Sequence, residues 1–170
     1  MSRLSYLQEK IVDLSTAQFR IQNWKFKGDT VVFTNGCFDI LHQGHVVYLA
    51  KAAELGKRLV VAINSDESVR QQNKGPERPI NPENARALLL AALGFVDLVV
   101  LFEGQTPIDL IEKFQPDVLV KGADYDPAER NPQSKKYIVG SEVVLNRGGK
   151  VEVIELEAGF STTNIINKLK

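Results

Sequence analysis

Short apolar runs alternate with helix-like segments along most of the chain, and this alternation is the feature that most limits the fold. Runs typical of strands buried on both faces lie at 30–34 (TVVFT), 58–63 (RLVVAI), 96–102 (VDLVVLF), 117–122 (DVLVKG) and 150–156 (KVEVIEL). Segments typical of helices lie at 43–56, 84–93, 106–114, 140–149 and 162–170. Such alternation predicts a parallel sheet with right-handed crossovers. We therefore expect an α/β fold, a doubly wound parallel sheet of about five strands with helices on both faces.

The domain organisation is expected to be simple. Residues 1–27 are polar and helix-like, which predicts an N-terminal helical arm. Residues 28–170 contain the alternating segments, without an internal repeat, a low-complexity tract or a linker that would divide them. The length suits one globular domain with an ordinary hydrophobic core.

Composition narrows the class of partner. Lysine and arginine together number 21, as do aspartate and glutamate, so no overall field attracts nucleic acid or an anionic membrane. The single cysteine excludes an internal disulfide framework, and the sequence carries no signal peptide and no apolar run of membrane-spanning length. These features predict a cytoplasmic protein that binds a small molecule, with neither nucleic acid nor membrane as a partner.

Both histidines of the chain lie in the stretch TNGCFDILHQGH (34–45), where a strand is expected to turn into a helix. If that helix begins near Gln43, His42 and His45 lie on its first turn and can face one ligand. Free backbone N–H groups and the positive end of the helix dipole favour an anion there, and Gly44 allows a phosphate to approach the backbone. Imidazole donors in such a place are suited to phosphoryl or nucleotidyl transfer.

Two other interpretations of the histidine pair remain open at this stage. The pair could bind zinc, but further ligands would then have to come from carboxylates or the one cysteine. Alternatively, His42 and His45 could be solvated residues that cap the helix.

Several motifs, in their order and spacing, resemble one enzyme family. These are FTNGCFDILHQGH, VVAINSDESVR, RPI, VDLVVLF, PDVLVKGADY and STTNII. From about Lys10 to its end the chain resembles the HxGH-type nucleotidyltransferases, which have a Rossmann-like fold, and within them the group that makes ADP-heptose. That group occurs as a stand-alone enzyme or as a domain fused to a sugar kinase.

The resemblance implies that ATP and a sugar 1-phosphate, D-glycero-D-manno-heptose 1-phosphate, react to give ADP-heptose and pyrophosphate. It implies Mg²⁺ carried by the triphosphate, no metal bound by the protein alone, and a separate heptose kinase that supplies the sugar phosphate. The resemblance is also compatible with a homodimer. It assigns His42 and His45 as catalytic donors to phosphate oxygens.

The remaining site residues are expected to bind the two substrates. The nucleotide is expected to contact Asn35, Gly36, Cys37, Phe38, Gly44, Arg86, Lys121, Gly122, Ser161, Thr162 and Thr163. The sugar phosphate is expected to contact Asp39, Asn64, Ser65, Asp66, Lys74, Arg78 and Asp124. Asp39 could order its loop instead, the stretch Asn64 to Asp66 could merely cap the next helix, and Ser161 or Thr162 could simply cap the last helix. Cys37 is expected to be a packed side chain rather than a nucleophile.

One departure from the family pattern bears on the substrate. Glycerol-phosphate cytidylyltransferases carry an arginine a few residues before the Ser-Thr-Thr turn, whereas this chain reads ELEAGFSTT. The missing phosphate contact is expected from Arg86, from Lys121, or from Lys74 and Arg78 in a loop, NKGPERPI (73–80), that could close over the substrates. Two alternatives stay open: a cytidylyltransferase acting on glycerol 3-phosphate or a related phosphate, and a catalytically silent nucleotide-binding module.

Overall fold

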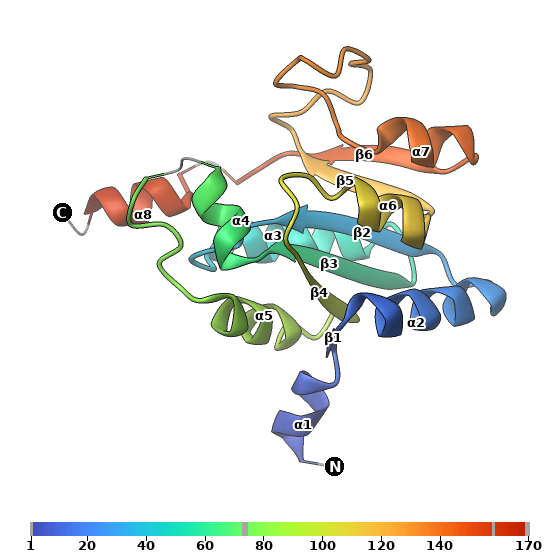
Figure 1. Cartoon of the computed structure of the whole chain (residues 1–170), viewed down its shortest axis with the longest axis horizontal. Helices are drawn as coiled ribbons and strands as arrows, with labels where there is room; N and C mark the ends of the chain where they lie inside the picture. The colour runs from blue at the N-terminus through green and yellow to red at the C-terminus, as the bar shows by residue number, and fades with distance from the viewer. Residues whose placement is uncertain (1, 73–74, 158, 169–170) are drawn as a thin grey trace.

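The computed structural model describes residues 2–72, 75–157 and 159–168. Its strands are β1 (Ile11–Val12), β2 (Val31–Gly36), β3 (Arg58–Asn64), β4 (Leu98–Phe102), β5 (Val118–Gly122) and β6 (Lys150–Ile154). Its helices are α1 (Arg3–Gln8), α2 (Leu14–Phe26), α3 (Gln43–Ala53), α4 (Asp66–Gln71), α5 (Glu83–Ala91), α6 (Ile108–Phe114), α7 (Ser141–Asn146) and α8 (Thr162–Lys168). These elements form one layer of strands between layers of helices (Figure 1).

The strands form one parallel sheet in the order β1-β4-β3-β2-β5-β6. From β2 the chain first adds β3 and β4 on one side and later adds β5 and β6 on the other side. The order therefore reverses at the neighbours β2 and β5, as in doubly wound sheets. The predicted doubly wound α/β fold is confirmed, with one strand more than expected.

The sheet is buried on both faces because alternate side chains of each strand enter different hydrophobic clusters. Val31 and Phe33 of β2 pack with residues of α2, α6 and α7, whereas Val32 between them packs with residues of α3 and α5. In Figure 1, α6 accordingly lies in front of the sheet and α3 behind it. The packing of the two clusters fixes the positions of the strand ends and of the loops that follow them.

The N-terminal segment differs from the helical arm predicted for residues 1–27. It contains two helices joined by strand β1, whose two residues pair with Val99 and Val100 of β4. The backbone N–H of Val99 also donates to the carbonyl of Lys10, at 2.8 Å. The segment is thus part of the sheet, and a boundary at residue 27 stays a prediction.

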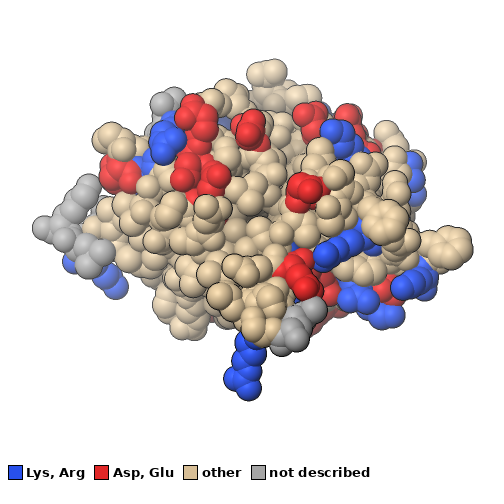
Figure 2. Space-filling view, turned by 60° about the horizontal axis from the view of Figure 1, so that its bottom comes forward, with Lys and Arg blue, Asp and Glu red and all other residues tan. Residues whose placement is uncertain are grey.

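The surface carries both signs of charge. Figure 2 shows acidic and basic side chains on the same face, several of them side by side, with uncharged surface between the groups. None of the helices in the described part of the chain is long and apolar enough to cross a membrane.

Gly56 lies at the end of the segment 43–56, which the sequence predicts to be helical, but it is not part of the observed helix. Helix α3 ends at Ala53, and a Cβ atom on Gly56 would lie 2.6 Å from Cγ2 of Val32 and 2.8 Å from the carbonyl oxygen of Thr30. The glycine therefore lets the chain after α3 pass close to the start of β2, which fixes the distance between this helix and the sheet.

We predict that Gly56→Ala lowers the free energy of unfolding by about 1–3 kcal/mol, because the added methyl group overpacks a rigid site. Gly94→Ala is the matched control, since a Cβ on Gly94 would meet no atom within 4 Å, and its effect should stay within about 0.5 kcal/mol. Urea unfolding of both variants makes the comparison. Equal stability of the two variants would contradict the role assigned to Gly56.

Candidate active site

A cavity of about 550 Å³ opens at the carboxyl edge of the sheet. Its walls come from the ends of β2, β3 and β5, the first turns of α3, the loop after β4, and the segment that joins β6 to α8. The cavity therefore lies where β2 and β5 diverge, which is the usual ligand site of a doubly wound sheet.

Most residues that the sequence predicts for the site line this cavity. They are Asn35, Gly36, Cys37, Phe38, His42, Gly44, His45, Asn64, Lys121, Gly122, Asp124, Ser161 and Thr162. The structure thus brings together four stretches that lie far apart in the sequence, 35–45, 64, 121–124 and 161–162. What each residue binds stays a prediction.

Helix α3 is tied to the sheet at the level of the cavity. The buried hydroxyl of Tyr48 lies 2.7 Å from Oγ1 of Thr34 on β2 and donates to the carbonyl of Val120 on β5, at 3.2 Å. Burial raises the pKa of Tyr48 well above its ordinary value, so the hydroxyl keeps its proton. One side chain therefore fixes α3 across both strands of the switch point.

The two histidines form a stacked pair at the start of α3. His42 is the N-cap residue, and its Nδ1 accepts a hydrogen bond from the backbone N–H of His45, at 3.3 Å. Since Nδ1 accepts, neutral His42 carries its proton on Nε2. The imidazole rings stack with centroids 3.7 Å apart, and the Phe38 ring meets His45 edge-on at 5.1 Å. The capping interpretation is thus confirmed for His42, and capping leaves its Nε2–H to serve as a donor.

Burial lowers the pKa values of both imidazoles. The pKa of His45 falls to about 4, chiefly through desolvation and further through the nearby His42, while the carbonyl of Ile40 opposes the shift. The pKa of His42 is also lowered, by desolvation. Nδ1 of His45 is buried and makes no hydrogen bond with any described residue. At neutral pH the cavity therefore presents two uncharged imidazoles.

Lys121 supplies positive charge to the cavity from the end of β5. It is the only lysine or arginine among the described residues of the lining. Its Nζ donates to Oδ1 of Asn35, at 2.6 Å, and lies over the Tyr125 ring, 5.2 Å from the centroid. The cation is thus held beside the end of β2, within the same cavity as the histidines.

Arg86 does not line the cavity, contrary to the predicted nucleotide contact. Its side chain is fully buried, and Nη2 lies 2.7 Å from Oδ1 of Asp66. Asp66, expected to bind the sugar phosphate, is therefore engaged by Arg86. The pair has one physical reason: a buried guanidinium needs an anionic partner, and here the partner is in the protein, so the geometry gives the two predicted substrate contacts no support.

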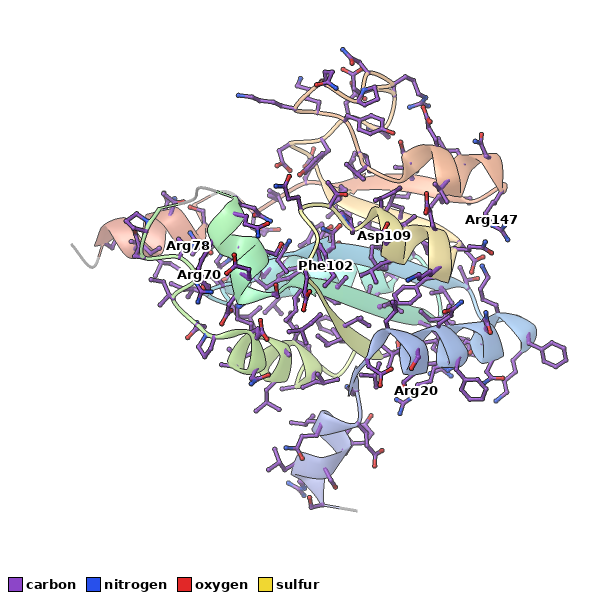
Figure 3. The ribbon with its side chains drawn as sticks, viewed as in Figure 1. Arg20, Arg70, Arg78, Phe102, Asp109 and Arg147 are labelled. Atoms are coloured by element: carbon purple, nitrogen blue, oxygen red, sulfur yellow. The ribbon has the colours of Figure 1, made fainter. Side chains whose placement is uncertain are left out.

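Asp39 and Arg78 also lie outside the cavity lining. The buried Asp39 carboxylate accepts from Nε of Arg78 and from the backbone N–H groups of Ile80 (2.8 Å) and Asn81 (2.9 Å). Figure 3 labels Arg78 on the connection from α4 to α5. The structure thus favours the alternative in which Asp39 orders the loop. Lys74, the other predicted cation of that connection, lies outside the described residues.

Three further predicted residues, Ser65, Ser161 and Thr163, lie at the N-terminal ends of helices. Oγ of Ser65 accepts from the N–H of Ser68, at 3.1 Å, and caps α4. Oγ of Ser161 accepts from the N–H of Asn164, at 3.0 Å, and caps α8, so the capping role expected for this turn is confirmed. Thr163 is exposed and does not line the cavity, whereas its neighbour Thr162 does.

The sequence did not single out several cavity residues. They include Gln72, Gln105, Thr106, Tyr125, Leu156 and Glu157. No local pattern in the sequence distinguishes these side chains from ordinary loop residues. Gln72 accepts from Sγ of the buried Cys37, at 3.2 Å, which agrees with a packed role for that thiol.

The carboxylates that line the cavity fit Mg²⁺ better than zinc. Among the described residues no three histidine, cysteine, aspartate or glutamate side chains group together as a metal site, so the zinc interpretation has no support. Asp124 and Glu157 do line the cavity. One or two carboxylates fit a Mg²⁺ ion that takes its other ligands from substrate phosphates and water.

A family model described as cytidylyltransferase-like matches residues 33–168. Curated relatives include the bifunctional protein HldE of Caulobacter sp. (strain K31), which is 52% identical over 95% of this chain and 31% of its own length. The protein of the same name from Pectobacterium carotovorum subsp. carotovorum (strain PC1) is 54% identical over 85% of this chain and 28% of its own. This chain thus spans about a third of the length of these relatives.

Two solved structures are also similar. A lipopolysaccharide core biosynthesis protein from Thermoplasma volcanium GSS1 is 32% identical, with a TM-score of 0.58, over 76% of this chain and 98% of that one. Pantoate-β-alanine ligase from Francisella tularensis has a TM-score of 0.59 over 94% of this chain and 77% of that one, but is only 17% identical. The second likeness supports the fold alone.

We predict that the His45 imidazole titrates near pH 4 in the ligand-free protein, because burial disfavours its charged form. NMR of the ring protons against pH measures this value. Because the folded pKa lies below the unfolded value of about 6.5, this group's contribution to stability is present above that pH and is lost as the pH falls toward 4. Titration of His45 near pH 6.5 in the folded protein would show that the cavity does not desolvate it.

Proposed function

The chain belongs to the cytidylyltransferase-like family, and on that premise we propose that it transfers the adenylyl group of ATP to D-glycero-D-manno-heptose 1-phosphate. The products are ADP-heptose and pyrophosphate, for a lipopolysaccharide or other surface-glycan precursor. The observation that carries the proposal is the stacked pair of neutral imidazoles at the amino end of α3, inside a cavity large enough for a nucleotide.

The similar proteins support a sugar phosphate as the acceptor of the adenylyl group. The Thermoplasma protein is described as acting in lipopolysaccharide core biosynthesis, and this chain covers nearly all of it. The HldE relatives are bifunctional, and the part they share with this chain is one portion of a longer polypeptide. A separate sugar kinase, a cytoplasmic location and a homodimer remain predictions that accompany this proposal.

The reaction needs stabilisation of negative charge on one phosphate. A phosphate oxygen of the sugar phosphate attacks the α-phosphorus of ATP, and the bond to the oxygen that bridges to the β-phosphorus breaks. Neutral His42 and His45 donate N–H groups to the α-phosphate oxygens, and the free N–H groups of α3 add to them. Because the protein fixes these donors before the substrate arrives, little reorganisation is needed as charge develops.

In glycerol-phosphate cytidylyltransferases an arginine shortly before the last helix supplies a positive charge. In this chain Lys121 supplies it instead. The segment 156–160 offers Leu156, Glu157 and Phe160 to the cavity instead. Lys121 enters from β5 and can neutralise phosphate charge from the other side of the crevice. Asp124 and Glu157 would hold Mg²⁺ together with the phosphates, where the ion would neutralise the leaving pyrophosphate.

We predict that ATP with heptose 1-phosphate gives faster pyrophosphate release than any other pair in a matrix of ATP, CTP and GTP against heptose 1-phosphate, glycerol 3-phosphate and other sugar phosphates. The loss of the upstream arginine and the relation to a lipopolysaccharide enzyme favour this pair. A higher rate with CTP and glycerol 3-phosphate would replace the proposal with the cytidylyltransferase alternative. No turnover with any pair would favour a silent nucleotide-binding module.

We further predict that His42→Asn or His45→Asn lowers kcat by about a hundredfold to a thousandfold, the usual cost of one preorganised donor to developing charge. The melting temperature should change little, because asparagine at position 42 can still cap α3. Gln43→Ala, an exposed change in the same turn, is the matched control and should keep wild-type turnover. If the histidine variants unfold, the pair has a structural role, and if they keep their turnover, the imidazoles are not the proposed donors.

A further inference from the structure

Phe38 has a backbone conformation that bulky residues rarely adopt. Its φ angle is 47°, in the left-handed region, although it lies between the end of β2 and the start of α3 and is not a glycine. Such a conformation persists only where the surroundings impose it, and these residues gather at functional sites. The contacts on either side of Phe38 therefore indicate what the loop is built to hold.

Both neighbours of Phe38 are fixed by α5 and the segment that leads into it. On one side, the carbonyl of Cys37 accepts a hydrogen bond from Nη1 of Arg86, at 2.7 Å. On the other side, the Asp39 carboxylate accepts the backbone N–H groups of Ile80 and Asn81. The loop is thus held from outside the cavity at the two positions that flank the strained residue.

Arg86 joins three segments that are distant in the sequence. Besides Cys37, its Nε donates to the carbonyl of Asn81, at 3.0 Å, and its Nη2 pairs with Asp66 at the start of α4. Only the forked guanidinium reaches all three acceptors at once; a lysine offers a single nitrogen. A buried ion pair seldom adds stability over apolar residues of similar volume, so a gain in stability does not by itself account for Arg86.

The strained residue leads directly to the histidine pair. The Phe38 ring is buried and meets the His45 imidazole edge-on, and His45 stacks on His42. A Cβ on Gly36 would lie 3.0 Å from Cε2 of Phe38, so the end of β2 leaves room for this ring and little more. The contacts run without a gap from Arg86 through the Cys37 carbonyl and Phe38 to His45.

We infer that Arg86 is a positioning residue for the histidine pair: by fixing the Cys37 carbonyl it holds Phe38 in the left-handed conformation and its ring against His45. This inference rests on the proposed function for its effect on turnover. The geometry that it describes is independent of the substrate. Arg86 contacts no reacting atom and acts only through Phe38.

The test compares Arg86→Lys and Arg86→Met with Arg58→Met as a matched control. Arg58 pairs with Asp29 (2.9 Å) and Asp97 (3.0 Å) at the start of β3, on the edge of the sheet opposite the cavity. For each variant we would measure the melting temperature, kcat and KM for ATP, and the titration of the His45 ring by NMR.

Both Arg86 variants should lower kcat by about tenfold to a hundredfold, the scale of a small misplacement of catalytic groups. KM for ATP should change far less, because the nucleotide contacts remain. The pKa of His45 should move up from about 4 toward its ordinary value as water reaches the imidazole. Arg58→Met should lower the melting temperature but leave both kcat and the His45 titration unchanged.

A folded Arg86→Met protein with wild-type kcat and wild-type His45 titration would overturn the inference. If Arg86→Met does not fold, Phe38→Gly decides, since glycine adopts a positive φ without strain but lacks the ring. That variant should raise the pKa of His45 with Arg86 intact, and an unchanged titration would overturn the inference. If the wild-type protein transfers no adenylyl group, the proposed function fails, while the titrations still test the positioning.

Discussion

The reversal of strand order between β2 and β5 is the constraint on which the rest of the site depends. All strands are parallel, so their carboxyl ends meet at one edge, and the two strands of the reversal send their chains to opposite sides of the sheet. They end in Gly36 and Gly122, both in the cavity wall. The first turn of α3, with His42 and His45, enters the resulting crevice from one side, and Lys121 enters it from the other. The strand order therefore determines where the site lies, and the side chains determine what it can bind.

The sequence predicted the elements whose signal lies in consecutive residues. Apolar runs such as 58–63 and 117–122 became β3 and β5, and the alternation with helices predicted the parallel sheet. Strand β1 escaped prediction because two residues between polar helices carry no periodicity, and its pairing with β4 depends on a contact some 88 residues away. Gly56 was included in the predicted helical segment 43–56 because its close approach to Val32 cannot be read from neighbouring residues.

The same distinction applies to the candidate site. His42, His45, Lys121 and Ser161 follow strands or begin helices, and such positions reach the carboxyl edge of a parallel sheet whatever their distant neighbours are. Arg86, Asp66, Asp39 and Arg78 were assigned to substrates from their places in the sequence, yet in the structure Arg86 pairs with Asp66 and Arg78 with Asp39. The partners of a charged side chain are set by the tertiary structure, across 20 residues for Arg86 and Asp66 and 39 for Arg78 and Asp39. These pairs form the framework behind the loop that carries the histidines.

We propose that the amino end of α3 and its histidine pair bind the α-phosphate of ATP. A crystal structure with an ATP analogue that has a methylene bridge between the α- and β-phosphorus atoms tests this most directly. The account predicts α-phosphate oxygens within hydrogen-bonding distance of the side chains of both His42 and His45. A triphosphate bound in the cavity with its α-phosphate away from both histidines would contradict it.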